Sequence, residues 1–222
     1  MASSTVENYI KEIYTLQFDK GAGGTVGMGE LATGLGVTPG TATSMVKGLD
    51  KAGLVSYVPR VGVELTEQGQ QLALLVLRRH RLVELFLVKV LGMEWHEIHD
   101  EAEALEHVIS DRVLERIDEL LEHPAWDPHG DPIPSATGEI KERELVSLDQ
   151  CEAGQRVQIG RIEDQEEAFL QYLDSNTLRP GQALEIRAID MHAGVVSVEF
   201  PDGRQCSLGF SAAGKILVEL SS

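Results

Sequence analysis

The chain has 222 residues, a hydrophobic content of 42% and a formal net charge of −17. This length allows two or three small domains, each with its own core. A membrane span requires about eighteen consecutive apolar residues, and the apolar stretches of this chain are much shorter. The N-terminal sequence MASSTVENYIKEIY lacks the charged and apolar regions of a secretory signal. These features predict a cytoplasmic protein without a membrane span.

The negative charge is distributed unevenly along the chain. The first 81 residues contain eight Lys or Arg and seven Asp or Glu, whereas residues 82–222 contain eleven and twenty-nine. Because binding to phosphates requires Lys and Arg, the first third is the part suited to nucleic acid, and the acidic remainder is suited to cations. Cys151 and Cys206 lie far apart without CxxC spacing, which favours reduced thiols over a disulfide framework or a zinc knuckle.

The N-terminal third contains the pattern of a winged helix. Helices are expected where apolar side chains recur at helical spacing, and short β-rich runs on either side of a turn predict a hairpin. Residues 21–24, GAGG, predict a loop. The predicted order is helix, helix, helix and hairpin, over residues 3–18, 27–35, 41–55, and 55–58 with 63–65.

The third predicted helix carries small hydroxyl residues and lysines opposite its apolar stripe. In a winged helix this element enters the major groove, where small side chains allow close approach and lysines reach phosphates. An arginine at the tip of the wing can contact the DNA backbone or minor groove. A winged helix used for protein contacts is the alternative, which the polar exposed face disfavours. The candidate DNA-binding residues are Thr38, Thr41, Thr43, Ser44, Lys47, Lys51 and Arg60.

The remainder of the chain predicts a helical segment followed by a small β domain. Helices are expected over residues 66–91, 95–109 and 111–121, and the extensive apolar surface of the first is typical of a dimerisation bundle. The prolines of HPAWDPHGDPIP end helical order. From residue 146, β-rich runs alternate with turns around one helix near 166–173, which predicts an antiparallel barrel. The fold class is therefore mainly α with a small β domain, with domains expected over residues 1–73, 74–140 and 146–222.

Two stretches place imidazole and carboxylate groups on single helical faces. HRLVE puts His80 and Glu84 at i and i+4, and HDEAEALEH repeats the pattern from His99 onward. A solvated acidic face is the alternative explanation for such a charge run. If the two helices pack side by side, two donor sets form: His80, Glu84 and His99 around one cation, and Glu103, Glu106 and His107 around another.

The donor types indicate a divalent transition metal. Nitrogen and oxygen donors without thiolate suit Mn²⁺, Fe²⁺, Co²⁺ or Zn²⁺, and a carboxylate-rich set favours the harder, octahedral ions. Motifs of metalloenzymes are missing from the sequence. HEIH is one residue shorter than the HExxH of zinc proteases, and no histidine follows a glutamate at the Glu-x-x-His spacing of di-iron bundles. We therefore expect a protein that is not an enzyme.

The segments RRHRLVELFL, GMEWHEIHDEAEALEHVISD and GDPIP, in this order and spacing, resemble the diphtheria-toxin-repressor family of metal-dependent transcriptional regulators. The likeness covers nearly the whole chain. It implies an N-terminal winged helix, a helical metal-binding and dimerisation domain, and a C-terminal SH3-like (FeoA-like) domain. It also implies a homodimer that binds operator DNA when a divalent metal is bound as corepressor. The resemblance assigns an ancillary metal site to His80, Glu84 and His99, and a primary site to Glu103, Glu106 and His107.

Two positions of the primary site differ between branches of the family. Glu103 stands where the iron-responsive branch has cysteine, and this likeness to the manganese-responsive branch favours Mn²⁺ over Fe²⁺. The ligand that the family takes from the first helix falls on Asn8. An amide oxygen is a weaker donor than a carboxylate, so Glu7 or Glu12 are the alternatives.

The C-terminal domain departs from the family at its metal-binding positions. These positions fall on Gln165 and Ala168, and alanine cannot bind a metal. Glu166 or Glu167 are the alternative donors, and a solvated pair of helix charges is the other interpretation.

Together these patterns predict a metal-dependent repressor of metal-ion homeostasis genes, with Mn²⁺ as the favoured metal and up to two sites per chain. Two alternatives stay open. One is an iron-dependent repressor of the same family. The other is a cytosolic metal sensor or buffer whose winged helix mediates protein contacts.

Overall fold

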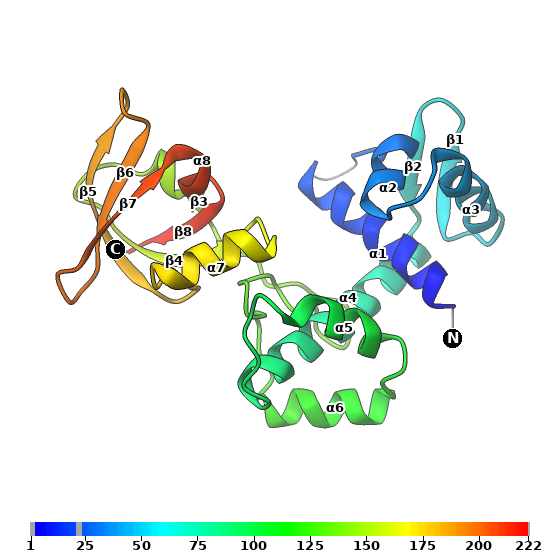
Figure 1. Cartoon of the computed structure of the whole chain (residues 1–222). Coiled ribbons are helices and arrows are strands. Elements are labelled where there is room, and N and C mark those ends of the chain that lie inside the picture. Colours follow the sequence, from blue (N-terminus) through cyan, green and yellow to red (C-terminus); the bar gives the residue numbers. More distant parts are fainter. Residues whose placement is uncertain (1–2, 21–23, 222) are drawn as a thin grey trace. The chain divides into compact units, whose positions relative to one another are not determined.

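The computed structural model of the chain describes residues 3–20 and 24–221, so that most of the predicted loop at 21–24 lies outside the described residues. Within these residues, no helix combines the length and apolar character needed to cross a membrane. Helix α4 runs from Glu67 to Lys89 (Figure 1), and the division between two compact units falls inside it. The units are Met1–His80 with Pro134–Glu139, and Arg81–Ile133 with Ile140–Ser222. The expected boundaries of three domains stay predictions.

The first unit has the helices and hairpin of the predicted winged helix-turn-helix. Ser3 caps α1 by accepting a hydrogen bond from Val6 N, and Thr38 caps α3 in the same way from Thr41 N. Because Thr38 is the cap and Pro39 suits the first turn of a helix, α3 begins earlier than expected from the apolar pattern. The elements are α1 (Ser4–Asp19), α2 (Met28–Gly34), α3 (Pro39–Lys51), β1 (Val55–Val58) and β2 (Gly62–Leu65).

One core holds the first unit together. Ile10 and Ile13 of α1, together with Val46 of α3, are fully buried in it. The hairpin joins this core through Val63, whose backbone exchanges two hydrogen bonds of 2.9 Å with Val26. The packing therefore fixes the wing against the same helices that position α3.

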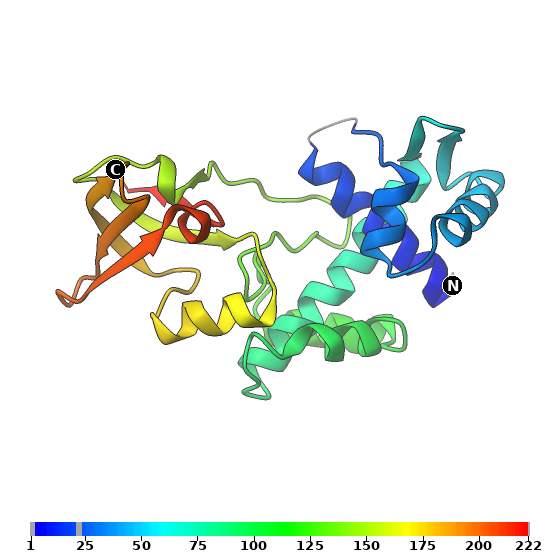
Figure 2. The ribbon, with the colours of Figure 1, turned by 45° about the horizontal axis from the view of Figure 1, so that its top comes forward.

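The helical part of the second unit consists of the end of α4 with α5 (Ile98–Glu106) and α6 (Asp111–Leu120). Val83 and Leu87 of α4 pack on Ile98 and Ala102 of α5, so the two predicted metal-binding helices do lie side by side (Figure 2). Helix α5 is shorter than the expected 95–109. The chain turns before it at Gly92, which has a φ of 70°, in the left-handed region that favours glycine.

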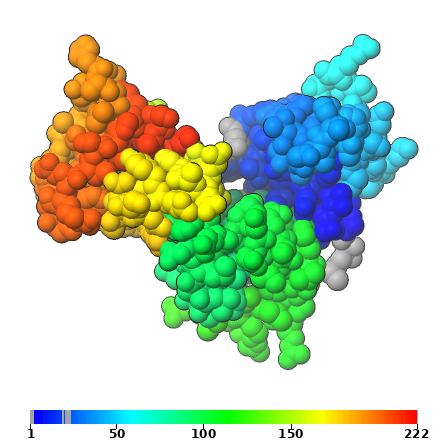
Figure 3. All heavy atoms as spheres, viewed as in Figure 1, coloured from blue at the N-terminus to red at the C-terminus, as the bar shows by residue number. Residues whose placement is uncertain are grey.

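The C-terminal part is the predicted small β domain. Its six strands pair antiparallel in the order β3-β8-β4-β5-β6-β7 (Figure 1). Leu170 and Leu173 pack one face of α7 into the core of this sheet, and the other atoms of α7 form part of the surface, in yellow in Figure 3. The elements are β3 (Val146–Ser147), the 3-10 turn η1 (Leu148–Gln150), β4 (Arg156–Ile162), α7 (Glu167–Ser175), β5 (Ala183–Asp190), β6 (Val195–Glu199), β7 (Gln205–Gly209), α8 (Phe210–Ala213) and β8 (Ile216–Leu220).

The segment before α5 and the loop at 125–133 attach the helices to this sheet. Trp95 is 2% exposed and packs within the core of the β domain. The carbonyl of His129 accepts a hydrogen bond of 2.9 Å from Ile162 N at the end of β4. Beside it, Gly130 has a φ of 88°, and a Cβ there would lie 2.0 Å from Gly160 O. Glycine is therefore required at 130 by both conformation and space.

A pair of substitutions separates these two requirements. Gly181 has a φ of 91° with no atom within 4 Å of an added Cβ, so Gly181→Ala should cost about 1 kcal/mol of stability from backbone strain alone. Gly130→Ala adds a collision with the backbone of β4, and we expect about 1–3 kcal/mol more. Urea unfolding of both variants gives the difference. Equal losses would show that the loop does not pack tightly against β4.

Candidate metal centre and DNA-binding face

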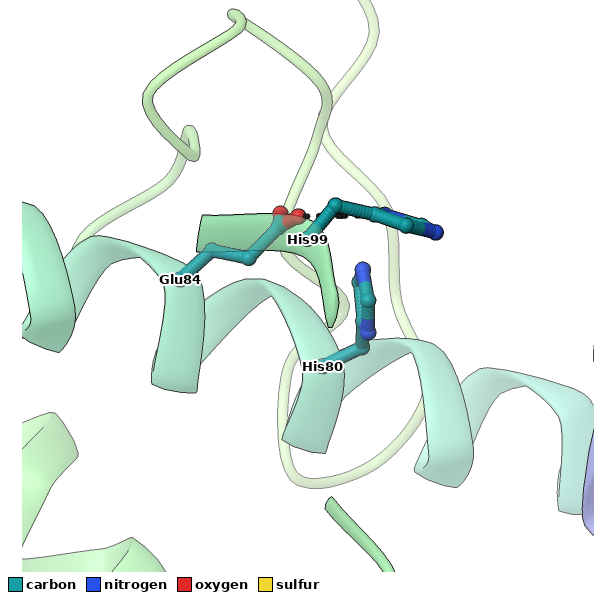
Figure 4. Close-up of side chains that lie close together, drawn as sticks. All are labelled: His80, Glu84 and His99. Carbon is teal, nitrogen blue, oxygen red and sulfur yellow. Dashed lines mark ion pairs between the residues drawn. The ribbon is translucent and has the colours of Figure 1, made fainter. Parts of the chain in front are cut away.

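His80, Glu84 and His99 form a cluster between α4 and α5. One ligand atom from each lies within 4.8 Å of the other two, and Figure 4 shows the three side chains turned toward one another. Glu84 Oε1 is 3.7 Å from His99 Nδ1. His80 is 7% exposed and Glu84 1%, whereas the side chain of His99 is 60% exposed. A cation at this cluster therefore has a buried carboxylate on one side and access from solvent on the other.

His80 also belongs to a second donor set on the same two helices. One atom each from His80, Glu103 and Glu106 lies within 4.8 Å of the others. Glu106 is 1% exposed, and its Oε1 lies 3.5 Å from His107 Nε2. The sequence pattern assigned His80 to the first set alone. On the structure, His80 lies between the two sets and can serve either one.

The three candidate donors on α1 have different surroundings. Asn8 Oδ1 is buried and finds no hydrogen-bond partner among the residues that the structure describes. Glu7 is 5% exposed, with Oε1 3.6 Å from Arg79 Nη1. Glu12 lies against Gly34 of α2. A buried acceptor without a donor is a polar atom that a cation can satisfy, and this favours Asn8 over the two glutamates.

The loop before α7 lies close to His99. An open cavity of about 620 Å³ is lined by His99, Glu163, Asp164, Gln165, Glu166 and Lys215. Gln165 is engaged, because its Nε2 donates a 2.7 Å hydrogen bond to Asp131 Oδ2. Glu167 instead accepts a hydrogen bond from Gln171 within α7, and Ala168 is exposed. Among the alternative carboxylate donors that the sequence offered, Glu166 and Glu167, it is Glu166 that lines the cavity.

A third set, which the sequence analysis missed, lies deeper in the second unit. Glu84, Asp127 and His129 are 1%, 5% and 1% exposed, and one ligand atom of each lies within 4.8 Å of the others. Asp127 and His129 belong to HPAWDPHGDPIP, whose prolines predicted the end of helical order and whose last five residues carry part of the family resemblance, but neither residue was expected to bind a metal. An Asp-x-His spacing in a loop carries no periodic signal, so only the tertiary fold brings these residues to Glu84.

The ring of His129 is oriented for binding a cation. Its Nε2 lies 3.0 Å from the carbonyl oxygen of Trp95, and the ring stacks on Trp95 with centroids 5.5 Å apart. Because a carbonyl can only accept a hydrogen bond, Nε2 is the donor, and Nδ1 is the ring nitrogen left to bind a cation. That Nδ1 is buried and has no hydrogen-bond partner within the described part of the chain. Backbone carbonyls that accept from the other ring nitrogen orient metal-binding histidines in this way.

Burial raises the pKa of Asp127 well above its ordinary value, and the neighbouring carboxylates of Asp131 and Glu84 raise it further, against the effect of Arg81. Two neighbouring buried carboxylates repel each other when both are ionised, and a divalent cation bound between them offsets this repulsion. All donors in the three sets are imidazole nitrogens or carboxylate oxygens. The described residues therefore fit a divalent first-row metal, with oxygen donors in the majority in two of the sets.

The candidate DNA-binding residues lie on the exposed side of α3 and on the wing. Ser44, Lys47 and Lys51 are exposed. Thr43 is half-buried, and its hydroxyl donates to Pro39 O at 2.7 Å. The hydroxyl of Thr43 thus already donates within α3, and its contact with DNA stays a prediction.

Three further candidates, Thr38, Thr41 and Arg60, have side-chain or backbone features that shape this face. The hydroxyls of Thr38 and Thr41 lie 2.9 Å apart at the start of α3. At the tip of the wing, Val61 N donates to Val58 O at 3.1 Å, and Arg60 has a φ of 68°. This turn position usually requires glycine or asparagine, so the wing holds an arginine in a strained conformation.

The raised pKa of Asp127 gives a prediction for the metal-free protein. A carboxyl group with a higher pKa in the folded state loses its proton more readily when unfolded, so its contribution to stability falls as pH rises from about 4 toward the folded pKa. Asp127→Asn removes this contribution, and its unfolding free energy relative to wild type should rise with pH over that window. Urea unfolding in EDTA at several pH values measures it.

Asp202 provides the control, because hydrogen bonds from the side chain and backbone of Arg204 lower the pKa of its exposed carboxyl. Asp202→Asn should show the opposite, shallow trend. A pH-independent difference for Asp127→Asn would contradict the buried repulsion.

Comparison with known proteins identifies each segment of the chain. Residues 1–63 match the N-terminal DNA-binding domain of the iron-dependent repressor family, and residues 66–135 match its metal-binding and dimerisation domain. Residues 146–220 match the FeoA domain. This assignment agrees with the expected fold class and with the resemblance to the diphtheria-toxin-repressor family.

Individual relatives also are metal-dependent repressors by name or members of the diphtheria-toxin-repressor group. The iron-dependent repressor IdeR of Mycobacterium tuberculosis is 38% identical over 130 residues, which are 59% of this chain and 55% of that protein. This match thus spans little more than half of the relative. The diphtheria toxin repressor of Corynebacterium diphtheriae is 31% identical over 203 residues, 85% of this chain and 86% of that protein.

Solved structures extend the likeness to nearly the whole chain. A manganese-dependent transcriptional repressor in complex with manganese is 38% identical, with a TM-score of 0.86 over 97% of this chain and 100% of that one. These relatives are repressors, in agreement with the expectation that the chain is not an enzyme. The chain belongs to the iron-dependent repressor family, which includes the diphtheria toxin repressor.

Proposed function

We propose that the protein is a cytoplasmic, homodimeric transcriptional repressor that binds operator DNA when loaded with a divalent cation, and that Mn²⁺ is this cation. The observation that carries the proposal is the burial of carboxylates at the junction of α4 and α5. Glu84 and Glu106 are each 1% exposed beside imidazole groups. Buried charges persist when they are paired or bind metals, and the matched family domain is a metal-binding one.

His80, Glu84 and His99 would hold one cation between α4 and α5. Glu103 and Glu106 would hold another, with His80 within reach and His107 beside Glu106. When bound, the cation supplies positive charge that offsets the repulsion among these carboxylates. The residues themselves fix where α5 lies against α4. Because α4 is continuous from Glu67 to Lys89, the donors on α4 lie on the same helix that begins in the DNA-binding unit. Cation and DNA binding are then linked, each favouring the arrangement that the other requires.

The choice of Mn²⁺ over Fe²⁺ rests on the donor atoms. Glu103 supplies oxygen, and both cysteines lie elsewhere, with Cys151 buried in the core of the β domain. The solved structure that shares 38% identity holds manganese. Iron is the alternative, because the IdeR relatives are named iron-dependent repressors. Competition between Mn²⁺ and Fe²⁺ in an anaerobic DNA-binding assay separates the two.

The exposed apolar side chains of the helical segment support a homodimer. Apolar side chains are stabilised when a partner removes them from water, and several apolar residues on or beside α4, α5 and α6 are at least 40% exposed. They are Val90, Leu91, Leu105, Val108, Val113 and Leu120, at 46%, 58%, 40%, 76%, 49% and 61% exposure.

A cytosolic metal buffer is the second candidate, favoured by the strongly acidic C-terminal two thirds of the chain. It predicts metal binding without any effect on DNA. A random pool of duplex DNA, selected on the Mn²⁺-loaded protein, provides the probe. Fluorescence anisotropy of the selected duplex with Mn²⁺ and with EDTA then decides between the two. Equal affinities in both conditions would favour the buffer.

Glu106 is a candidate metal ligand whose charge can be removed without a change of side-chain size. Glu106→Gln keeps the volume of the side chain but removes a buried charge that faces His80 and Glu103. Metal-stimulated DNA affinity should fall by about 100-fold, since even the loss of a group that only hydrogen-bonds to a metal ligand costs about 10–100-fold in metal affinity. Glu115→Gln, on the exposed side of α6, removes the same charge and should leave the anisotropy titration unchanged. The reverse order of effects would contradict the assignment.

Lys47, on the candidate DNA-binding face, is exposed on α3 and is placed to neutralise a phosphate. Lys47→Ala should weaken binding to all sequences alike and reduce the slope of log K against log salt by about 1. Lys141→Ala, exposed in the segment before β3, is the matched control and should leave the slope unchanged. A sequence-dependent effect of Lys47→Ala would instead indicate a base contact.

A further inference from the structure

The cavity beside His99 already contains a positive charge. Lys215 lies between α8 and β8, and its Nζ donates a hydrogen bond of 2.5 Å to Asp164 Oδ2. The backbone carbonyl of Lys215 accepts a 2.9 Å hydrogen bond from Glu163 N, which fixes the residue beside the loop before α7. Its ammonium also lies 5.3 Å from the centre of the Phe169 ring. Lys215 is thus held from three sides at the acidic wall of the cavity.

Asp164 is held in place by the same loop. Its Oδ1 accepts a 3.0 Å hydrogen bond from Glu166 N, while Oδ2 faces the ammonium of Lys215. Two other members of the loop have separate partners, since Gln165 donates to Asp131 and Glu163 lies 3.7 Å from Arg161 Nη2. Asp164 and its partner, the ammonium of Lys215, therefore both line the cavity that His99 also lines.

We propose that Lys215 is a tethered competitor of the divalent cation, and that it sets the metal concentration at which the set of His80, Glu84 and His99 fills. The proposal rests on the proposed function, because it requires that set to bind a cation. Its basis is the placement of a fixed ammonium and an ammonium-bound carboxylate in the wall that faces His99.

The ion pair between Lys215 and Asp164 is weak enough for a divalent cation to replace Lys215 as the partner of Asp164. The side chains of Lys215 and Asp164 are 44% and 20% exposed, and ion pairs at such exposure contribute little net stability. A divalent cation near His99 therefore competes with Lys215 for Asp164 at small cost. At the same time, the ammonium repels the cation through a partly screened field. Both effects raise the metal concentration needed for occupancy.

The test is a calorimetric titration of Mn²⁺ into the full-length, metal-free protein without DNA. Lys215→Met keeps the length of the side chain and removes its charge, so the site that depends on His99 should bind Mn²⁺ about three- to tenfold more tightly. His99→Ala identifies the heat that belongs to this site. Lys215→Arg, which retains the charge, should behave as wild type. In the double variant Lys215→Met with Asp164→Asn, most of the gain should disappear.

Arg187→Gln is the control for net charge. It removes one positive charge from the ion pairs that Arg187 makes with Glu185 and Glu199 on β5 and β6, away from the residues that line the cavity. Its Mn²⁺ affinity should stay within about twofold of wild type.

The proposal is overturned if Lys215→Met binds Mn²⁺ no more tightly than wild type, if Arg187→Gln gives an equal gain, or if wild type shows no heat that depends on His99. Failure of the proposed function has a different signature. There, the wild-type protein binds DNA equally with Mn²⁺ and EDTA, whatever the calorimetric titration shows.

Discussion

The carboxylate of Glu84 lies almost fully buried in the second half of α4 and belongs to two donor sets. His80 and His99 complete one set, and Asp127 and His129 complete the other. Burying an ionised carboxylate is costly unless a positive charge or several hydrogen-bond donors compensate for it. Much of the second unit is arranged around this cost. The pKa of the neighbouring Asp127 is raised first by its own burial and then by the carboxylates of Asp131 and Glu84, and Arg81, 3.7 Å from Asp127, acts against this shift.

Glu84 also links the exposed and the buried donor sets. The His99 side opens to solvent, whereas Asp127 and His129 are enclosed by the loop that packs on β4. A charge placed on one side of a carboxylate alters what the other side can bind, so the two sets are expected to act together. Asp131, next to the buried set, contacts Arg161 and Gln165 of the β domain. The loop therefore joins the donor sets to the sheet as well as to α4.

The sequence allowed most of the helices and strands to be predicted, because amphipathic periodicity is a local property. It also predicted that His80, Glu84 and His99 share a cation, since i and i+4 spacing on two neighbouring helices brings such side chains together. Other features depend on contacts between distant residues. Asp127 and His129 reach Glu84 only through the folded loop, and Lys215 reaches Asp164 across 51 positions. The hydroxyl of Thr43 donates to the backbone of α3, a local hydrogen bond that composition alone does not reveal.

Trp95 belongs by sequence to the helical segment, yet its indole is buried in the core of the β domain. The two segments are consequently interdependent in folding, although family comparison separates them into different modules. A gene shortened after the helical segment would encode a protein with an uncovered indole and an unsupported loop at Gly130. The evolutionary loss or exchange of the β domain in such a lineage would therefore require compensating changes around Trp95 first.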